Sequence, residues 1–167
     1  MRYKVVKKQE NSRMCLICGL KNRFGLKTSF YEMENNELVA LFTPTEEHQS
    51  YPGRLHGGVA SAVLDETIGR AILIHQDNIW GVTVELNVKY HKPLPLNEEL
   101  KVVGRITKDT KKIFEGTGEI LLSNGDVAVS AFGKYIKMPL DRIADFNEQR
   151  EEWKITTGKN EPAEIEI

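Results

Sequence analysis

The sequence predicts an α+β domain in which one curled antiparallel sheet of five to six strands wraps around a single long helix. Residues 58–75 form the longest run of helix-forming and apolar residues in the chain. A helix that is apolar on nearly every side is normally buried at the centre of a fold. Segments typical of β-strands then follow one another from residue 81 to residue 137, and a sheet curled around one helix buries both.

One domain is expected from a chain of 167 residues without an internal repeat. The formal net charge of -1, with acidic and basic residues interspersed, excludes the strong positive field typical of proteins that bind nucleic acid or anionic membranes. The N-terminal residues lack the apolar core of a signal peptide, and no stretch reaches the ~18 apolar residues of a membrane span. We therefore expect a cytoplasmic protein.

The first elements are a lead-in and a hairpin. Residues 1–28 are expected to be irregular or briefly helical, because glycines interrupt them. Residues 29–43 contain two apolar runs that flank a polar break at 34–37, whose asparagines tolerate the positive φ of a tight turn. A loop should follow, and then the helix over residues 58–75, about 25 Å long.

Four strands are expected after the helix, over residues 81–91, 99–107, 112–122 and 127–137. The Asp109-Thr110 and Asn124-Gly125 pairs should form turns between the last three. The first strand alternates strictly, which predicts an apolar face and a polar face. The apolar face would carry Val82, Val84, Leu86, Val88 and Tyr90, and the polar face Thr83, Glu85, Asn87, Lys89 and His91.

The domain proper is thus expected over residues 29–138. Residues 139–167 should form a short exposed helix capped by Asp141, followed by a frayed polar tail.

Asp65 is the first candidate for chemistry, because it is a carboxylate in the middle of an otherwise apolar helix. A buried carboxylate is normally paired, protonated or retained for a reaction. The adjacent Glu66 precedes Arg70 by four residues, which is the favourable spacing for a helical ion pair. Asp65 has no such partner at helical spacing, where only the small Ser61 and Gly69 occur. A catalytic aspartate and a hydrogen-bonded structural aspartate both remain open.

The segment His56-Gly57-Gly58 lies at the start of the predicted helix. Backbone N–H groups are unpaired there and the positive end of the helix dipole favours an anion. Glycines let a substrate carbonyl approach the backbone closely, as stabilisation of the oxyanion in acyl transfer requires. The nine-residue step from His56 to Asp65 makes the combined pattern more specific than either part.

The segment LHGGVASAVLDETIG resembles the signature of hotdog-fold acyl-CoA thioesterases of the phenylacetate-pathway type. Three other segments are also similar to members of that superfamily: CLICGLKNRFGLKTSF, HQSYPGR and GVTVELNVKYHKPLPLNEEL. The resemblance covers about residues 15–137. It implies a five- or six-stranded sheet around a long helix, homodimers or homotetramers, and hydrolysis of acyl-CoA thioesters with neither a metal nor another cofactor.

The resemblance also implies roles for individual residues. Asp65 matches the carboxylate that acts as nucleophile or as general base on water, and the Gly57 N–H matches the oxyanion donor. His56 matches the histidine that orients the thioester or the loop, and Thr83 a hydroxyl that positions water. Ser50 departs from relatives that carry Asn or Gln against the thioester carbonyl, so Gln49 is the substitute. The substrate-binding candidates are Gln49, Ser50 and Gly58.

Other functions stay open alongside the thioesterase. A hotdog hydratase or dehydratase would use the carboxylate with a histidine, for which His48 and His75 are candidates. A non-catalytic acyl-CoA-binding module would keep the fold without turnover. Cys15 and Cys18 are too few for a disulfide framework or a complete zinc site, so structural thiols are expected. Zinc shared between two subunits is the alternative.

Overall fold

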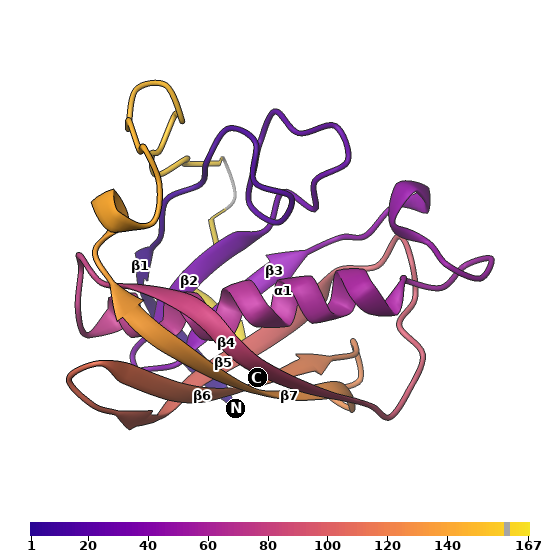
Figure 1. Ribbon diagram of the computed structural model, residues 1–167. Helices are drawn as coiled ribbons and strands as arrows, with labels where there is room; N and C mark the ends of the chain where they lie inside the picture. The colour runs from indigo at the N-terminus through magenta and orange to yellow at the C-terminus, as the bar shows by residue number, and fades with distance from the viewer. Residues whose placement is uncertain (159–160) are drawn as a thin grey trace.

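The computed structural model describes residues 1–158 and 161–167, and it confirms the expected arrangement of one helix on one curled antiparallel sheet (Figure 1). Helix α1 (Gly57–Arg70) lies across the sheet and contacts strands β3 to β7. The sheet has eight strands in the order β4-β7-β6-β5-β3-β2-β1-β8. Their bounds are β1 Arg2–Lys8, β2 Ser29–Met33, β3 Leu38–Phe42, β4 Trp80–Tyr90, β5 Leu100–Asp109, β6 Ile113–Leu121, β7 Val127–Met138 and β8 Glu164–Glu166.

The expected hairpins form at the expected turns. Strands β2 and β3 pair around Asn36, which has a φ of 62°, in the left-handed region that asparagine tolerates. Strands β6 and β7 pair around Gly125, with a φ of 84°. Turn chemistry of this kind is local, so the sequence suffices to place it.

The helix is shorter than expected. It ends at Arg70 and continues as a 3₁₀ turn, η2 (Ala71–Ile74), rather than running to His75. The Ala71 N–H is shared between the carbonyls of Thr67 and Ile68, which is the usual way a helix tightens at its end. Ala71, Ile72 and Leu73 are nevertheless buried, so the apolar pattern persists beyond the α-helix.

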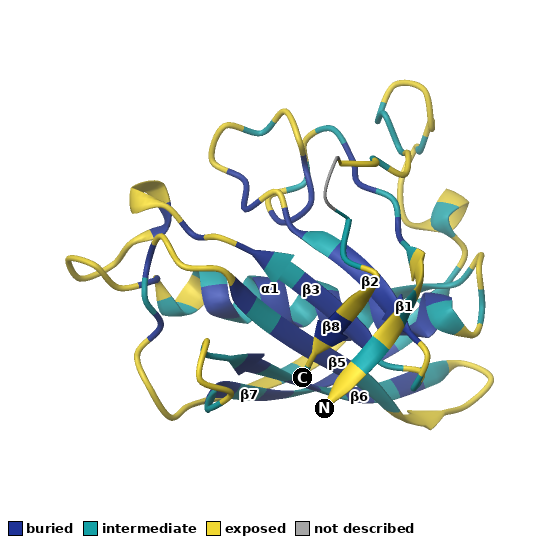
Figure 2. Ribbon diagram, turned by 180° about the vertical axis from the view of Figure 1, so that it is seen from behind, coloured by how far each residue is buried: buried dark blue, intermediate teal, exposed yellow. Residues whose placement is uncertain are grey.

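Both chain ends differ from expectation and raise the strand count from five or six to eight. The supposed lead-in contains β1, which pairs with β2, and the supposed frayed tail contains β8, which pairs with β1. The expected C-terminal helix is reduced to one 3₁₀ turn, η3 (Leu140–Arg142). The two termini lie together, and the Ile167 N–H donates to the Met1 carbonyl at 2.8 Å (Figure 2).

Two apolar clusters hold the sheet. The larger lies between α1 and the sheet and includes Val63, Leu64, Ile68, Phe114 and Ile120, all fully buried. The smaller lies on the other face, where β8 contributes Ile165 to a cluster with Tyr31, Met33, Val39 and Val103. This second cluster explains why the short terminal strands stay attached.

A β-bulge in β4 changes which side chains face the helix. The register between β4 and β7 shifts between Thr83 and Glu85, so Val84 is an extra residue and is 51% exposed. Thr83 therefore shares the helix-facing side with Leu86 and Val88. The strict alternation expected from the sequence, which put Thr83 on the polar face, is wrong at this point.

No helix in residues 1–158 and 161–167 is long and apolar enough to cross a membrane.

Candidate active site

Asp65 lies in the middle of α1 and is half-buried. Its Oδ1 accepts hydrogen bonds from the Thr83 hydroxyl at 2.9 Å and from the Tyr135 hydroxyl at 3.1 Å. The expectation that Asp65 lacks partners is thus wrong, because strands β4 and β7 supply two. Both donors hold the same oxygen, and among the described residues no group binds Oδ2. The side chain is fixed while one oxygen stays available.

Tyr135 is buried and adds to the fixed geometry. Burial raises the pKa of its phenol, and the nearby charge of Asp65 raises it further. The phenol therefore remains protonated and can donate to a carboxylate. Its hydroxyl also donates to the Asp65 carbonyl at 3.1 Å.

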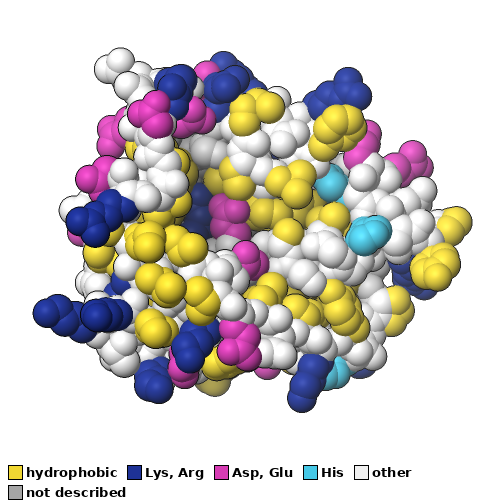
Figure 3. Space-filling model, in the orientation of Figure 1, with side chains coloured by type: hydrophobic (Ala, Val, Ile, Leu, Met, Phe, Trp, Pro, Cys, Tyr) yellow, Lys and Arg dark blue, Asp and Glu magenta, His cyan; other side chains and the backbone are white. Residues whose placement is uncertain are grey.

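Asp65 lines a cavity of about 210 Å³ that α1 forms with β4 and β7. Two glycines, Gly69 and Gly81, line this cavity beside Trp80 and Thr83, and their lack of side chains leaves the space open. A Cβ at Gly81 would lie 2.6 Å from the Phe114 ring, so this glycine is required by packing. Figure 3 shows a hollow in the face that carries α1 in Figure 1, with charged side chains at its bottom and hydrophobic ones around it.

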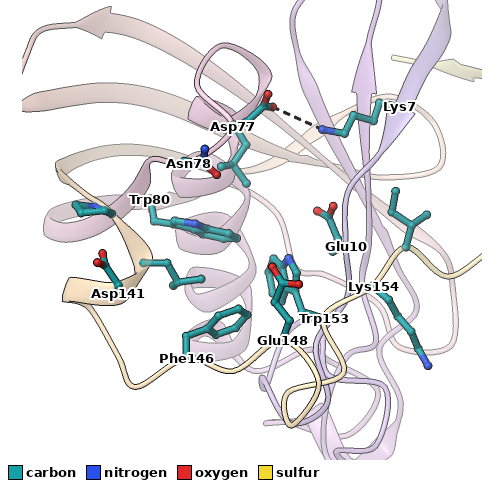
Figure 4. Close-up of a pocket in the computed structure, with 14 residues that line it drawn as sticks. Lys7, Glu10, Asp77, Asn78, Trp80, Asp141, Phe146, Glu148, Trp153 and Lys154 are labelled. Atoms are coloured by element: carbon teal, nitrogen blue, oxygen red, sulfur yellow. Dashed lines mark ion pairs between the residues drawn. The ribbon is translucent and has the colours of Figure 1, made fainter.

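Trp80 also lines a larger cavity, about 840 Å³ in volume (Figure 4). The larger cavity lies beside β1 and the C-terminal segment, and Phe146 and Trp153 also line it. An ion pair between Lys7 and Asp77, 3.8 Å long, bridges part of its rim.

The start of α1 forms the second part of the candidate site. The His56 Nδ1 accepts from the Gly58 N–H at 2.9 Å, so His56 caps the helix and the Gly58 N–H is already engaged. No acceptor in the described chain binds the Gly57 N–H. The Gly57 carbonyl accepts from the Tyr90 hydroxyl at 2.7 Å, which anchors this corner to β4. A free donor at a helix N-terminus can stabilise an oxyanion.

Gly57 lines a different cavity from Asp65. This cavity is about 380 Å³ and is also lined by Ser50, Arg54, Tyr90 and Lys92. Gly57 and Asp65 are eight residues apart on α1, or about 12 Å along a helix. The structure thus builds both expected parts of the site but keeps them in separate cavities of one chain.

The remaining sequence candidates divide into two groups. Ser50 lines the Gly57 cavity, whereas the Gln49 side chain accepts from the Gly53 N–H at 3.2 Å within its own loop. His48 is buried and its ring contacts the Phe24 carbonyl and the Thr45 N–H. His75 is exposed and lies beyond the far end of α1.

The roles of two tyrosine hydroxyls were not predicted from the sequence. Tyr135 and Tyr90 both occur in strands that alternate regularly, where a tyrosine gives no signal of its own. The role of Tyr135 follows from the pairing of β4 with β7, which places it opposite Thr83. The register between these two strands is needed to identify Tyr135.

One cluster in the described chain could hold a metal ion. The Sγ atoms of Cys15 and Cys18 and a carboxylate oxygen of Glu66 lie within 4.8 Å of one another. The expected ion pair between Glu66 and Arg70 is confirmed at 3.0 Å.

Comparison with known proteins gives a consistent result. Residues 52–129 match the family model described as "Thioesterase superfamily". Acyl-coenzyme A thioesterase 13 of Mus musculus is 25% identical over 52% of this chain and 62% of its own length. The Homo sapiens protein of the same name is 31% identical over 41% of this chain and 49% of its own length. The chain therefore spans between about half and three fifths of these curated relatives.

Solved structures share the fold. A thioesterase superfamily protein superposes with a TM-score of 0.68 and 27% identity, over 74% of this chain and 60% of the other. The E. coli PaaI protein from the phenylacetic acid degradation operon gives 0.61 and 16%, over 68% and 80%. A hypothetical thioesterase protein with coenzyme A from Streptococcus pneumoniae gives 0.61 and 18%, over 67% and 86%.

Proposed function

We propose, from the match of residues 52–129 to the thioesterase superfamily model and from the fold shared with a thioesterase superfamily protein, that this chain hydrolyses an acyl-CoA thioester to a free acid and coenzyme A. The observation that carries the proposal is the geometry of Asp65, whose Oδ1 is held by two hydroxyls while Oδ2 has no partner in the described chain. A fixed carboxylate with one available oxygen suits either attack on a carbonyl or activation of a water.

The reaction follows from the two parts of the site. The thioester carbonyl accepts a hydrogen bond from the Gly57 N–H, and the dipole of α1 favours the negative charge that develops on its oxygen. Asp65 either removes a proton from a water that attacks the carbonyl carbon, or attacks that carbon itself to form a mixed anhydride, which water then hydrolyses to release the acid and free Asp65. In either route the carbon–sulfur bond breaks and coenzyme A leaves as its thiol. Thr83 keeps the carboxylate oriented, and His56 holds the helix start in place.

Asp65 and the Gly57 N–H can act on one thioester carbonyl only if two chains share each site. The edge of the sheet provides a surface through which two chains can pair. Strand β4 is eleven residues long and lies at the sheet edge, where a strand is free to pair with another chain. In a self-pairing centred between Leu86 and Asn87, Thr83 would lie opposite Tyr90 of the partner subunit. Thr83 binds Asp65 and Tyr90 binds Gly57. One chain's Asp65 would thus approach the other's Gly57 corner.

The charged residues that line the Gly57 cavity also support acyl-CoA as the substrate. Arg54 and Lys92 line the Gly57 cavity, and cations there suit the phosphates of coenzyme A. The structural neighbour with coenzyme A carries the same fold. We infer that the phosphates of acyl-CoA bind at Arg54 and Lys92, that its thioester reaches the Gly57 N–H of the same chain, and that its acyl group lies towards Asp65 and Trp80 of the other chain.

A screen of hydrolysis across acyl-CoA chain lengths tests this function, read as thiol release and run with wild type and Asp65→Asn. Release by wild type that falls at least ~100-fold in the variant supports it. Binding of acyl-CoA without release would instead identify a binding module. Addition of water to an enoyl-CoA without thiol release would identify a hydratase. A chain-length preference that shifts in Trp80→Ala would place the acyl group beside Trp80.

A further inference from the structure

The segment Cys15-Leu16-Ile17-Cys18-Gly19 forms a tight turn around a sulfur atom. The N–H groups of Ile17 and Cys18 approach the Cys15 Sγ at 3.3 Å and 3.5 Å. The Gly19 N–H donates to the Cys15 carbonyl at 2.8 Å, and a Cβ at Gly19 would lie 2.3 Å from that oxygen. The turn therefore requires glycine after the second cysteine, and it directs backbone donors at the first thiol.

Donors also surround the second sulfur. The Cys18 Sγ accepts from the Arg70 guanidinium at 3.2 Å and lies 3.4 Å from the Ser12 hydroxyl. Cys18 is 1% exposed. These two contacts fix the Cys18 sulfur beside the Cys15 sulfur and the Glu66 carboxylate.

Glu66 completes a set of three ligands in one chain. Its Oε2 lies 3.1 Å from the Cys15 Sγ, while Oε1 accepts from Arg70 at 3.0 Å. All three ligand atoms lie within 4.8 Å of one another. Tetrahedral zinc, with bonds of about 2.3 Å to sulfur and about 2.0 Å to oxygen, keeps its ligand atoms about 3.5–3.8 Å apart. Small side-chain adjustments suffice to reach that geometry.

The local charge matches a divalent cation. In the metal-bound form, after both thiols release their protons, two thiolates and one carboxylate give a formal charge of about -3 and Arg70 adds one positive charge, so a dication makes the group neutral. Mixed sulfur and oxygen ligands suit zinc, whereas calcium and magnesium select oxygen alone.

We propose that Cys15, Cys18 and Glu66 of a single chain bind one zinc ion, with a water in the fourth position. Binding exchanges the ion for the two thiol protons, which pass to solvent. The site joins the N-terminal segment to α1 one residue after Asp65, so its role is structural. The sequence alone indicated only the two cysteines as ligands from one chain. Glu66 is 48 positions beyond Cys18, so its position beside them follows only from the fold.

Metal analysis of the purified chain tests the proposal. It should find about one zinc per chain, and cobalt loaded in its place should give the sulfur-to-metal charge-transfer absorption of thiolate ligation. Well under one zinc per chain after incubation with zinc would overturn it. Formation of a Cys15–Cys18 disulfide with no metal bound would also overturn it and indicate a redox pair.

Variants separate the ligands from their neighbours. Cys15→Ser and Glu66→Gln should each lose most of the bound zinc, whereas Ser12→Ala, which touches Cys18 without being a ligand, should retain it. Circular dichroism shows whether each variant is folded, and zinc retained in folded Cys15→Ser would contradict the assignment. Asp65→Asn should keep its zinc, and Cys15→Ser/Cys18→Ser should still hydrolyse substrate when folded. Failure of the zinc site and failure of the thioesterase are thus distinguishable.

Discussion

Replacing Glu66 by glutamine should destabilise the protein strongly, because it leaves the Arg70 charge buried without its carboxylate. The Arg70 side chain is only 4% exposed and the Glu66 side chain 21%, so the pair is not the exposed one that its helical spacing suggested. The Arg70 guanidinium also lies 4.5 Å from the Phe30 ring centroid and donates to the Glu10 carbonyl.

The expected cost follows from these contacts. Removing one partner of a buried ion pair costs about 3–5 kcal/mol. The glutamine carbonyl can still accept from Arg70, which returns about 1 kcal/mol. We therefore expect a loss of about 2–4 kcal/mol in the free energy of unfolding. An exposed pair would have cost about 0.5 kcal/mol.

Urea unfolding measures this loss, with a chelator present so that zinc binding does not contribute. Glu166→Gln is the matched control, because Glu166 and Arg2 form a pair with side chains 65% and 71% exposed. The control should change the free energy by at most about 1 kcal/mol. If Glu66→Gln costs no more than Glu166→Gln, the buried pair does not hold α1 as inferred.

Three further results are expected. Thr83→Val should lower kcat about 10-fold by removing one hydrogen bond to Asp65, and an unchanged kcat in steady-state assays would exclude that role. His56→Ala and Asp65→Ala chains, each nearly inactive, should recover about a quarter of wild-type activity when refolded together, because about half of the dimers are mixed and hold one intact site of two. Mixed dimers without activity would rule out the shared site. Burial opposes ionisation of Glu161, but hydrogen bonds from Lys8, the Gly158 N–H and Tyr31 lower its pKa to about 2. Because this pKa is lower than the value of about 4.3 in the unfolded chain, ionised Glu161 stabilises the fold above pH ~4.3, and that stability is lost as the pH falls towards 2. Glu161→Gln should therefore reduce the dependence of the free energy of unfolding on pH in this range, as measured by urea unfolding. A pH dependence as steep as that of the wild type would contradict this.

The sequence predicted most of the elements that local patterns determine. The central helix, the Asn36 and Gly125 turns and the last four strands follow from apolar periodicity and turn residues, which depend on neighbours in the chain. The end of the helix was misplaced because the apolar pattern continues through a 3₁₀ turn that buries the same side.

Features that depend on distant contacts were missed. Strand β1 is largely polar and β8 has only three residues, and both are held by pairing of β1 with β2, pairing of β8 with β1 and packing on the second cluster. The bulge at Val84 adds one residue between pairing partners, which strict alternation cannot represent. The same limit applies to the site, where Asp65 and Gly57 were found from one helix while Tyr135 required the register of β7.

The kcat of Asp65→Asn for acyl-CoA hydrolysis tests the central claim most directly. The substitution keeps the size of the side chain and its contacts with Thr83 and Tyr135 but removes the charge that attack or base catalysis needs. We predict a fall in kcat on the order of 100-fold or more with little change in stability. If Asp65→Asn hydrolyses acyl-CoA at the wild-type rate and Glu66→Gln does not, with both variants shown to be folded, the catalytic carboxylate is Glu66 and the account is contradicted.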